Sequence, residues 1–355
     1  MSSETPRKFV RLRNRKAASS TGRVLREIRE RIAHVSLGTA AFSSILITAA
    51  IVIVLLYESS SFFGSEIVPE DLQTRYQELK DLKGADKLSA ADRQELQQIT
   101  DQITHVSLWE FFTSTQWAPL FDPPKHGILP LVTATIMTTV IALTVALPIG
   151  TIAAVYLSEF AHAAFRETIK PSLELLSAVP TVIYGYFALT VVSPVLQWIM
   201  PDLPRANMLS AGIVMGLMII PYVSSLSEDA MRSVPMLLRE GSMALGANKF
   251  ITAFRVVIPS ALSGIGAAYI LGISRAIGET MVVAIAAGMQ PRFTFNPTEQ
   301  AQTITSYIVA TSQGETPHGT VGYQSIFAAG LVLFCMTLIF NILGYWLRRR
   351  YHQAY

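Results

Sequence analysis

The sequence predicts an all-α polytopic membrane protein with six transmembrane helices and with both termini in the cytoplasm. Of the 355 residues, 51% are hydrophobic and only 15% are charged, whereas an average soluble domain carries roughly 25% charged residues. So few charges cannot cover the apolar surface of a soluble chain of this length. The composition therefore disfavours a soluble enzyme, a disordered chain and a nucleic-acid-binding protein.

Long runs with few or no charges supply the expected helices, since a span needs about 20 apolar residues. The six runs are 37–57, 127–158, 175–201, 206–227, 256–291 and 316–347. Only 256–291 contains charges, namely Arg275 and Glu279. The first run is too long for the apolar part of a signal peptide and has no A-x-A cleavage site, so we expect a retained span.

The distribution of Lys and Arg predicts the orientation. With the N-terminus inside, the four cytoplasmic segments hold 19 Lys/Arg, ten of them in residues 1–34. The outside stretch 58–125 holds twelve acids against six bases. The predicted divisions are a basic cytoplasmic arm 1–34, a first span 35–57, an extracytoplasmic insertion 58–126, a core 127–347 with a cytoplasmic loop 228–258, and a basic cytoplasmic tail 348–355.

The insertion shows the pattern of a helical hairpin. Apolar residues recur at helical spacing in two groups, Leu72, Tyr76, Leu79 and Leu82, then Leu96, Ile99 and Ile103. Pro69 suits a helix start, Gly84 interrupts the pattern, and Ser89 with Asp92 resembles a capping box. The hairpin is either a solvated spacer or a docking surface for an extracytoplasmic partner, and both readings stay open.

The sequence offers no catalytic or metal-binding pattern. Cys335 is the one cysteine, and the six histidines have no paired spacing. Neither a phosphate-binding loop nor a G-x-S-x-G motif is present. We expect that this chain is no enzyme and binds no cofactor or metal, and that the energy for transport against a gradient comes from another chain.

The most specific motif lies in the cytoplasmic loop. Glu240 is followed by Gly246 and, after nine further residues, by Val256-Val-Ile-Pro259. This predicts a short helix, a bend at Gly246 and a second helix that returns to the bilayer at Pro259. Small residues let the backbone of another protein approach closely, and they are Gly241, Ser242, Ala244, Gly246 and Ala247. An ordinary amphipathic loop helix is the alternative.

The spacing of Glu240, Gly246 and Pro259 resembles the EAA loop of ABC-importer permeases. The resemblance implies a type I (MetI-like) architecture in which this loop forms a coupling helix, seated in a groove of the cytoplasmic ATPase. The family signature reads Glu-Ala-Ala, whereas this chain reads Glu240-Gly241-Ser242. Because the replacements are also small, the fit to the ATPase should be preserved.

Four further segments, 110–119, 127–130, 176–185 and 272–281, are similar to the PstC-type permeases of phosphate importers. The resemblance implies a multi-pass protein of the bacterial plasma (inner) membrane. Its implied partners are a PstA-type permease, two PstB-type ATPase subunits that bind ATP and Mg, and a PstS-type phosphate-binding protein. A permease for molybdate, sulfate or a phosphonate, a membrane enzyme acting on phosphorylated lipid, and a phosphate-sensing scaffold remain alternatives.

Arg275 and Glu279 stand out because they interrupt an apolar run. An arginine at the centre of a span costs about 2.5–3.5 kcal/mol, so Arg275 should have a partner or a water-filled cavity. Glu279 follows by four residues, one helical turn away on the same face. Either the two charges neutralise each other in a structural pair, or they line an anion path together with Thr280.

Prolines inside the apolar runs predict kinks, because each removes a helix hydrogen bond. The positions are Pro148, Pro180, Pro194 and Pro221. Tyr184 and Gly185 follow Pro180, and the glycine could allow close helix packing. We favour a structural role over gating at each of these positions.

Overall fold

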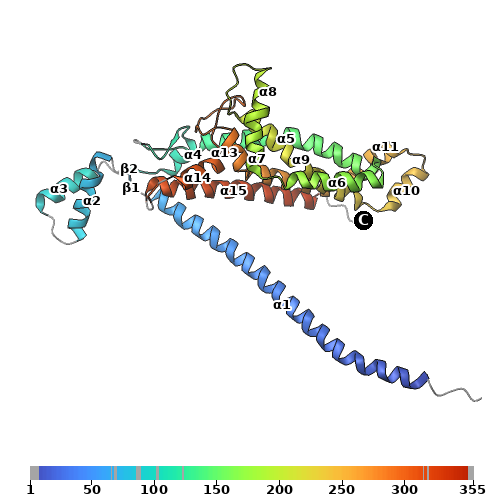
Figure 1. Ribbon diagram of the computed structural model, residues 1–355. Coiled ribbons are helices and arrows are strands. Elements are labelled where there is room, and N and C mark those ends of the chain that lie inside the picture. Colours follow the sequence, from blue (N-terminus) through green and yellow to red (C-terminus); the bar gives the residue numbers. More distant parts are fainter. Residues whose placement is uncertain are drawn as a thin grey trace, which may run out of the picture. The chain divides into compact units, whose positions relative to one another are not determined.

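The computed structural model describes residues 8–64, 66–67, 70–84, 89–100, 104–121, 124–314, 316–317 and 320–350, and it is built almost entirely of helices (Figure 1). Two compact units divide the chain, Met1–Tyr57 and Glu58–Tyr355. Most of α1 (Lys8–Phe63) belongs to the first unit, and its last residues belong to the second. The second unit holds the helical bundle.

Five segments of the described chain are long and apolar enough to cross a membrane. They are Arg29–Phe63 in α1, Leu129–Phe160, Met208–Arg232, Lys249–Ile277 and Val321–Trp346. In element terms, the last four are α5 (Leu129–Val155) with the π-helical turn η1 (Tyr156–Phe160), α9 (Met208–Arg232), α11 (Lys249–Thr252) with η3 (Ala253–Val257) and α12 (Ile258–Ile277), and α15 (Val321–Arg350). Each overlaps one of the six predicted apolar runs, so the composition located these spans correctly.

The third expected span, 175–201, is not one straight helix. The structure has α6 (Ala163–Ser177), a break, and then a helical run made of α7 (Thr181–Phe187), η2 (Ala188–Val192) and α8 (Ser193–Gln197). The two halves meet at 85°, and the number of spans reaches six only if this bent pair counts as one. The break follows from Pro180, since a proline disfavours helical backbone at the preceding residue, Val179.

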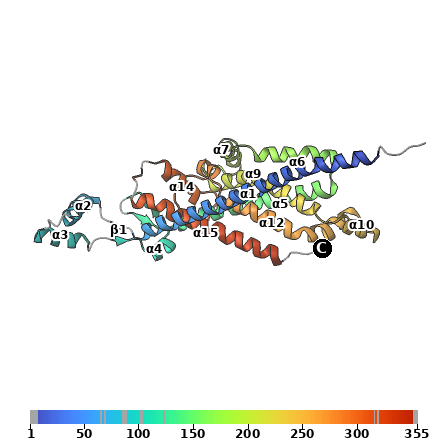
Figure 2. The same cartoon turned by 90° about the horizontal axis from the view of Figure 1, so that it is seen from below.

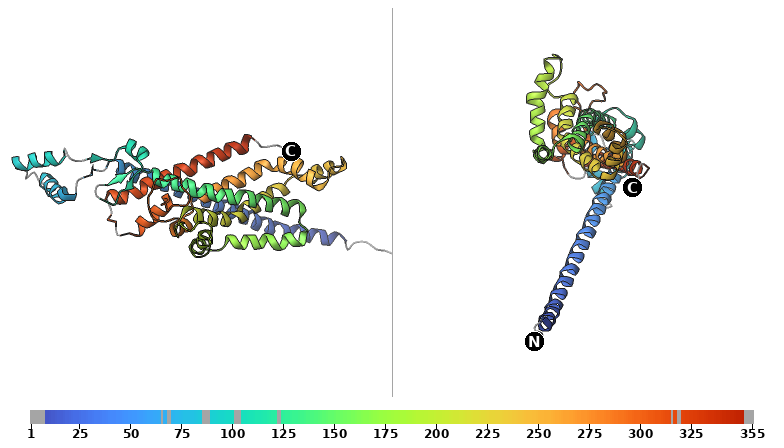
Figure 3. Two further views of the ribbon diagram at one scale, coloured as in Figure 1. Left: turned by 90° about the horizontal axis from the view of Figure 1, so that it is seen from above. Right: turned by 90° about the vertical axis from the view of Figure 1, so that its right-hand side faces the viewer.

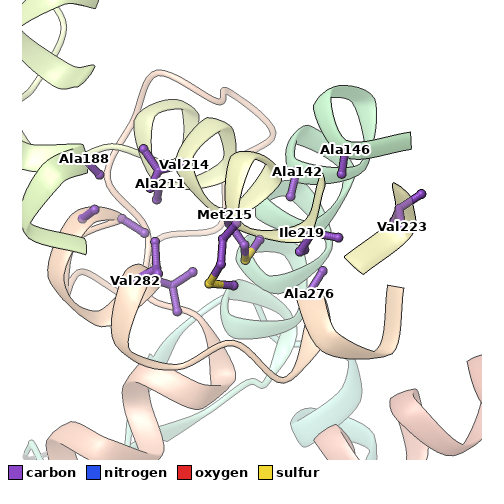
Figure 4. Packing of buried hydrophobic residues seen from close by; sticks show 14 residues of the cluster. Ala142, Ala146, Ala188, Ala211, Val214, Met215, Ile219, Val223, Ala276 and Val282 are labelled. Atoms are coloured by element: carbon purple, nitrogen blue, oxygen red, sulfur yellow. The ribbon is translucent and has the colours of Figure 1, made fainter. Parts of the chain in front are cut away.

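The core of the bundle is held by close approach of α5 and α9. A Cβ at Gly212 would lie 2.7 Å from Cβ of Ile141, and one at Gly216 would lie 2.7 Å from the carbonyl oxygen of Ala142. Small residues one turn apart give this kind of contact between membrane helices. Figure 4 shows the adjoining buried cluster, in which side chains from α5, α9, α12, η2 and α13 (Met281–Ala286) converge.

The bundle helices α5, α9, α12 and α15 run side by side (Figures 1 and 3). At one end lie α10 (Met236–Ala244) and α11, and α15 ends on the same side (Figures 1 and 2). At the other end, α4 (Leu108–Thr113), β3 (Trp117–Ala118), β4 (Lys125–His126) and α14 (Ile304–Gln313) enclose a second buried cluster that includes Phe62.

The insertion contains the expected helical hairpin, α2 (Glu70–Gly84) and α3 (Ala90–Thr100), closed by an antiparallel pairing of β1 (Glu66–Ile67) with β2 (Thr104–His105). The capping box is confirmed, because the amide of Ser89 donates to Asp92 at 3.1 Å and the amide of Asp92 donates to the Ser89 hydroxyl at 3.4 Å. Pro69 and Ile103 lie outside the described residues.

Candidate functional site

Arg275 lies at the end of a helix. α12 ends at Ile277 and is capped by Gly278, and α13 begins at Met281. The expectation that Arg275 sits near the middle of one long span is therefore wrong. Arg275 is in the last turn of α12, and the negative end of the helix dipole there favours a cation.

Glu279 stabilises the restart of the chain. Its Oε1 accepts the backbone N–H of Met281 at 3.1 Å and that of Val282 at 3.3 Å, which are orphan donors at the start of α13. Its carbonyl oxygen accepts the hydroxyl of Thr305 at 2.7 Å. Glu279 is 9% exposed, so its carboxylate is fixed by the local backbone.

Arg275 and Glu279 form no ion pair within 4.0 Å in the described part of the chain. Because α12 ends between the two residues, they are not one turn apart on a continuous helix, and the expected mutual neutralisation is wrong. Thr280, the third expected path residue, is half-buried, and its hydroxyl donates to the carbonyl of Gly278 at 3.2 Å.

The guanidinium of Arg275 contacts the aromatic ring of Tyr222 in α9. Cζ of Arg275 lies 5.2 Å from the centre of the Tyr222 ring, a cation–π geometry. Nε of Arg275 is buried without a hydrogen-bond partner among the described residues. A half-buried guanidinium that lacks a carboxylate keeps its paired N–H donors available for an oxyanion. Sequence reasoning missed Tyr222, which has no motif of its own.

Tyr184 and Gly185 fix α7. The Tyr184 hydroxyl donates to the carbonyl of Leu176 at 2.8 Å, across the break at Pro180. A Cβ at Gly185 would lie 3.0 Å from Cδ1 of Ile285 and 3.2 Å from the carbonyl oxygen of Met281. The expected close packing at Gly185 is confirmed. The α7 contact holds α13, and therefore the chain just beyond Arg275, in place.

The other expected kink positions lie within helices. Pro148 is inside α5 and Pro221 is inside α9, and both helices continue through them. Pro259 lies in the first turn of α12, where its missing N–H costs little. At Pro148 and Pro221, the structural role that we favour over gating stays a prediction.

The loop at 228–258 has the expected conformation. α10 begins after Pro235, Gly246 has φ of +88°, and Asn248 starts α11 by accepting the amide of Ile251 at 2.8 Å. The side chain of Glu240 is exposed, as are Gly241, Ala244 and Gly246, while Ser242 and Ala247 are half-buried. The helix and its bend are confirmed.

Leu237 of α10 and Leu245, which directly follows this helix, lack cover in the described structure. Leu237 is 79% exposed and Leu245 is 91% exposed. Exposed leucines beside small residues are typical of a surface that a partner covers. The expected contact of this loop with an ATPase stays a prediction.

Arg239 joins α10 to the bundle. Its guanidinium lies 3.1 Å from the carboxylate of Glu159 in η1, and the side chains are 13% and 9% exposed. It also donates to the carbonyl of Met231 at 2.8 Å and to that of Val234. Sequence reasoning missed this pair, because 80 residues separate its members and neither has a local signature.

A helical bundle with several apolar spans, a half-buried cation and an exposed loop helix defines a multi-pass membrane transport component. Residues 146–353 match the family model described as "Binding-protein-dependent transport system inner membrane component", and the chain belongs to this family. It is thus the non-catalytic inner membrane permease of an ABC importer, which works with an ATPase and a periplasmic binding protein.

Relatives agree with the family. The "Probable ABC transporter permease protein YqgH" of Bacillus subtilis (strain 168) is 34% identical over 248 residues, covering 70% of this chain and 80% of the relative. The "Phosphate transport system permease protein PstC 1" of Mycobacterium bovis is 32% identical over 278 residues, covering 68% and 81%. An inward-facing structure of the MetNI methionine ABC transporter is 16% identical, with a TM-score of 0.48 over 64% of this chain and 95% of that one.

Proposed function

We propose that this chain is the PstC-type permease of a phosphate ABC importer and that phosphate passes Arg275. The proposal rests chiefly on one observation, the half-buried guanidinium of Arg275 that has no carboxylate partner among the described residues. The PstC relatives at about 32% identity support phosphate as the substrate.

The chemistry of Arg275 suits this substrate. A guanidinium is planar and offers paired N–H donors that match two oxygens of a tetrahedral oxyanion. The ring of Tyr222 packs against the guanidinium of Arg275 and keeps the positive charge on the α9 side of α12. Because the surroundings contain few competing charges, an anion at this point is strongly attracted.

Glu279 would add selectivity. Oε1 serves the backbone of α13, while Oε2 is free of these bonds. In the proposal, Oε2 accepts a hydrogen bond from a protonated phosphate oxygen. Sulfate at neutral pH has no such proton and would be repelled, so specificity comes from penalising the wrong anion. Thr280 provides a hydroxyl at the same break.

Transport would proceed by alternating access. The complete importer contains this chain, a PstA-type permease, two PstB-type ATPases that bind ATP and Mg, and a PstS-type phosphate-binding protein. ATP binding draws the ATPases together, α10 moves with its ATPase, and the path opens outward. Hydrolysis then resets the inward-facing state. ATP can shift the equilibrium between the inward-facing and outward-facing states only by binding more tightly to one of them.

Substrate competition tests the proposal. The complete complex is reconstituted in proteoliposomes with its binding protein, and uptake of labelled phosphate is measured with excess unlabelled phosphate, sulfate, molybdate or a phosphonate. We expect that only phosphate competes fully. If labelled molybdate, sulfate or phosphonate is taken up instead, the chain is a permease for that oxyanion.

A further inference from the structure

A cavity of about 390 Å³ opens at the end of the bundle that carries α10 and α11. Its walls come from four regions of the chain, namely η1, α6, the end of α9, and the α10–α11 loop. Its volume is near the small end of the range for ligand sites, about 300–1,000 Å³. The cavity is separate from Arg275, which does not line it.

Positive charge dominates this cavity. Arg166, Arg232, Arg239 and Lys249 line it, against the single carboxylate of Glu159. The four cations come from four different elements, α6, α9, α10 and α11, so folding rather than a local charge run brings them together.

The available carboxylates do not cancel this charge. Glu159 is held by Arg239 at 3.1 Å. Arg232 lies 3.6 Å from Glu228, whose carboxylate is already 2.8 Å from Lys170. Arg166 and Lys249 have no ion pair with any described residue. Two cations therefore face the cavity without compensation, and a third is only partly compensated.

Two hydroxyl groups lie beside these cations, and both line the cavity. The hydroxyl of Ser158 donates its proton to Glu159 at 2.8 Å, and the hydroxyl of Thr252 lies 3.0 Å from that of Ser242. The donors left for a ligand are therefore chiefly the guanidinium and ammonium groups, which bind tetrahedral phosphate oxygens.

We infer that this cavity binds a phosphate-type oxyanion, supplied either as inorganic phosphate or as the phosphate of a lipid headgroup. The bound anion bridges Arg166 of α6 and Lys249 of α11. By joining α6 to the α10–α11 loop, it stabilises the observed position of that loop. The site goes beyond the proposed transport path and does not depend on which substrate the importer carries.

The exposed part of α10 leaves the cavity accessible. Leu237 and Leu245, the most exposed leucines of the loop, do not line it. A partner that covers these leucines contacts α10 on a different face, so the anion site and the expected ATPase contact can be occupied together.

Cysteine modification tests the site directly, without any requirement for transport. Ser158→Cys is introduced with Cys335→Ser, because Cys335 is an exposed free thiol. The complete complex is placed in phosphatidylcholine nanodiscs, and modification at position 158 by a negatively or a positively charged methanethiosulfonate is followed by peptide mass spectrometry. A positive cavity should favour the negative reagent by about tenfold or more, because local potential raises encounter rates by that order.

Inorganic phosphate should slow this modification in a saturable way, whereas chloride should not. Arg166→Ala or Lys249→Gln should reduce both the preference for the negative reagent and the protection. Ser172→Cys, on the neighbouring helix α6 but outside the cavity, is the control and should show no protection. Equal effects at positions 158 and 172, or unchanged ratios in both charge variants, would overturn the inference.

A comparison of two lipid compositions distinguishes the two sources of the anion, inorganic phosphate and a lipid headgroup. Protection in phosphatidylglycerol nanodiscs without added phosphate identifies the headgroup as the ligand. Protection that appears only when phosphate is added to phosphatidylcholine nanodiscs identifies inorganic phosphate. Absence of protection in both arms contradicts the site, and it leaves the uptake experiment on the transport path unaffected.

Discussion

The guanidinium of Arg275 lies over the ring of Tyr222, with 5.2 Å between Cζ and the ring centre. This contact joins the end of α12 to α9 next to the break at Gly278 and Glu279. A cation–π contact contributes about 0.5–2 kcal/mol, less than a carboxylate partner could in a dry site. The guanidinium is therefore held in position and still able to bind an anion.

The cap at α13 predicts different results for two substitutions of Glu279. Glu279→Ala removes the acceptor for the amides of Met281 and Val282, so the free energy of unfolding should fall by about 1 kcal/mol. Glu279→Gln keeps an oxygen acceptor and should lose less. Thermal unfolding of the purified complex in detergent measures both, and equal stability of the two variants would contradict the capping role.

One of these two substitutions also tests the selectivity role of Glu279. Glu279→Gln removes the negative charge while it retains the cap. We expect impaired phosphate uptake and stronger competition by sulfate in proteoliposomes. An unchanged substrate profile would leave Glu279 with the structural role alone.

Gly185 provides a test of the α7–α13 packing. Gly185→Ala places a methyl group 3.0 Å from Ile285, and such overpacking costs about 1–3 kcal/mol. Gly266 of α12 is the matched control, because a Cβ there meets nothing within 4 Å. Gly266→Ala should be neutral or stabilising in the same thermal assay. Equal destabilisation by both substitutions would contradict the packing argument.

Much of the architecture was predictable from local signals. The apolar runs with few or no charges located the five long spans, and the Ser89–Asp92 pattern and Gly246 predicted a cap and a bend that the structure contains. The kink predicted at Pro180 is confirmed by the 85° break. The helix end at Gly278 was not predicted, because Gly278 lies in apolar sequence and hydropathy alone does not show where a helix ends.

The contacts of the candidate site were less predictable. The ring of Tyr222 meets Arg275 across two helices, and Glu159 meets Arg239 over 80 residues of chain. Such pairs depend on tertiary packing, for which no spacing rule exists. Residue type nevertheless identified Arg275 correctly as a charge that needs an explanation.

A comparison of Gly246 with Gly241 distinguishes the effect of backbone conformation from the effect of the space available for a side chain. Both have open surroundings, but only Gly246 has a positive φ, +88°. Gly246→Ala should cost about 1–2 kcal/mol, because a side chain disfavours left-handed backbone. Gly241→Ala, inside α10, should stabilise the chain by up to about 1 kcal/mol. Thermal unfolding and copurification of the ATPase measure the outcome, and equal behaviour of the two variants would exclude the proposed bend effect.

The buried pair of Arg239 and Glu159 predicts a non-additive result. Arg239→Ala leaves the Glu159 carboxylate buried and unpaired, which costs about 3–5 kcal/mol. Adding Glu159→Ala removes that charge and should recover part of the loss. A double variant that is as unstable as the sum of the single variants would show that the two residues do not act as a pair.

The most direct test of the central claim is the uptake of labelled phosphate by proteoliposomes that contain the complete complex. The complex with Arg275 is compared with the Arg275→Ala and Arg275→Lys variants. We expect that Arg275→Ala abolishes ATP-dependent uptake although the complex copurifies intact. Arg275→Lys should retain only part of it, since lysine keeps the charge without the paired donors. Normal uptake by the Arg275→Ala complex would contradict the assignment of Arg275 to the phosphate path.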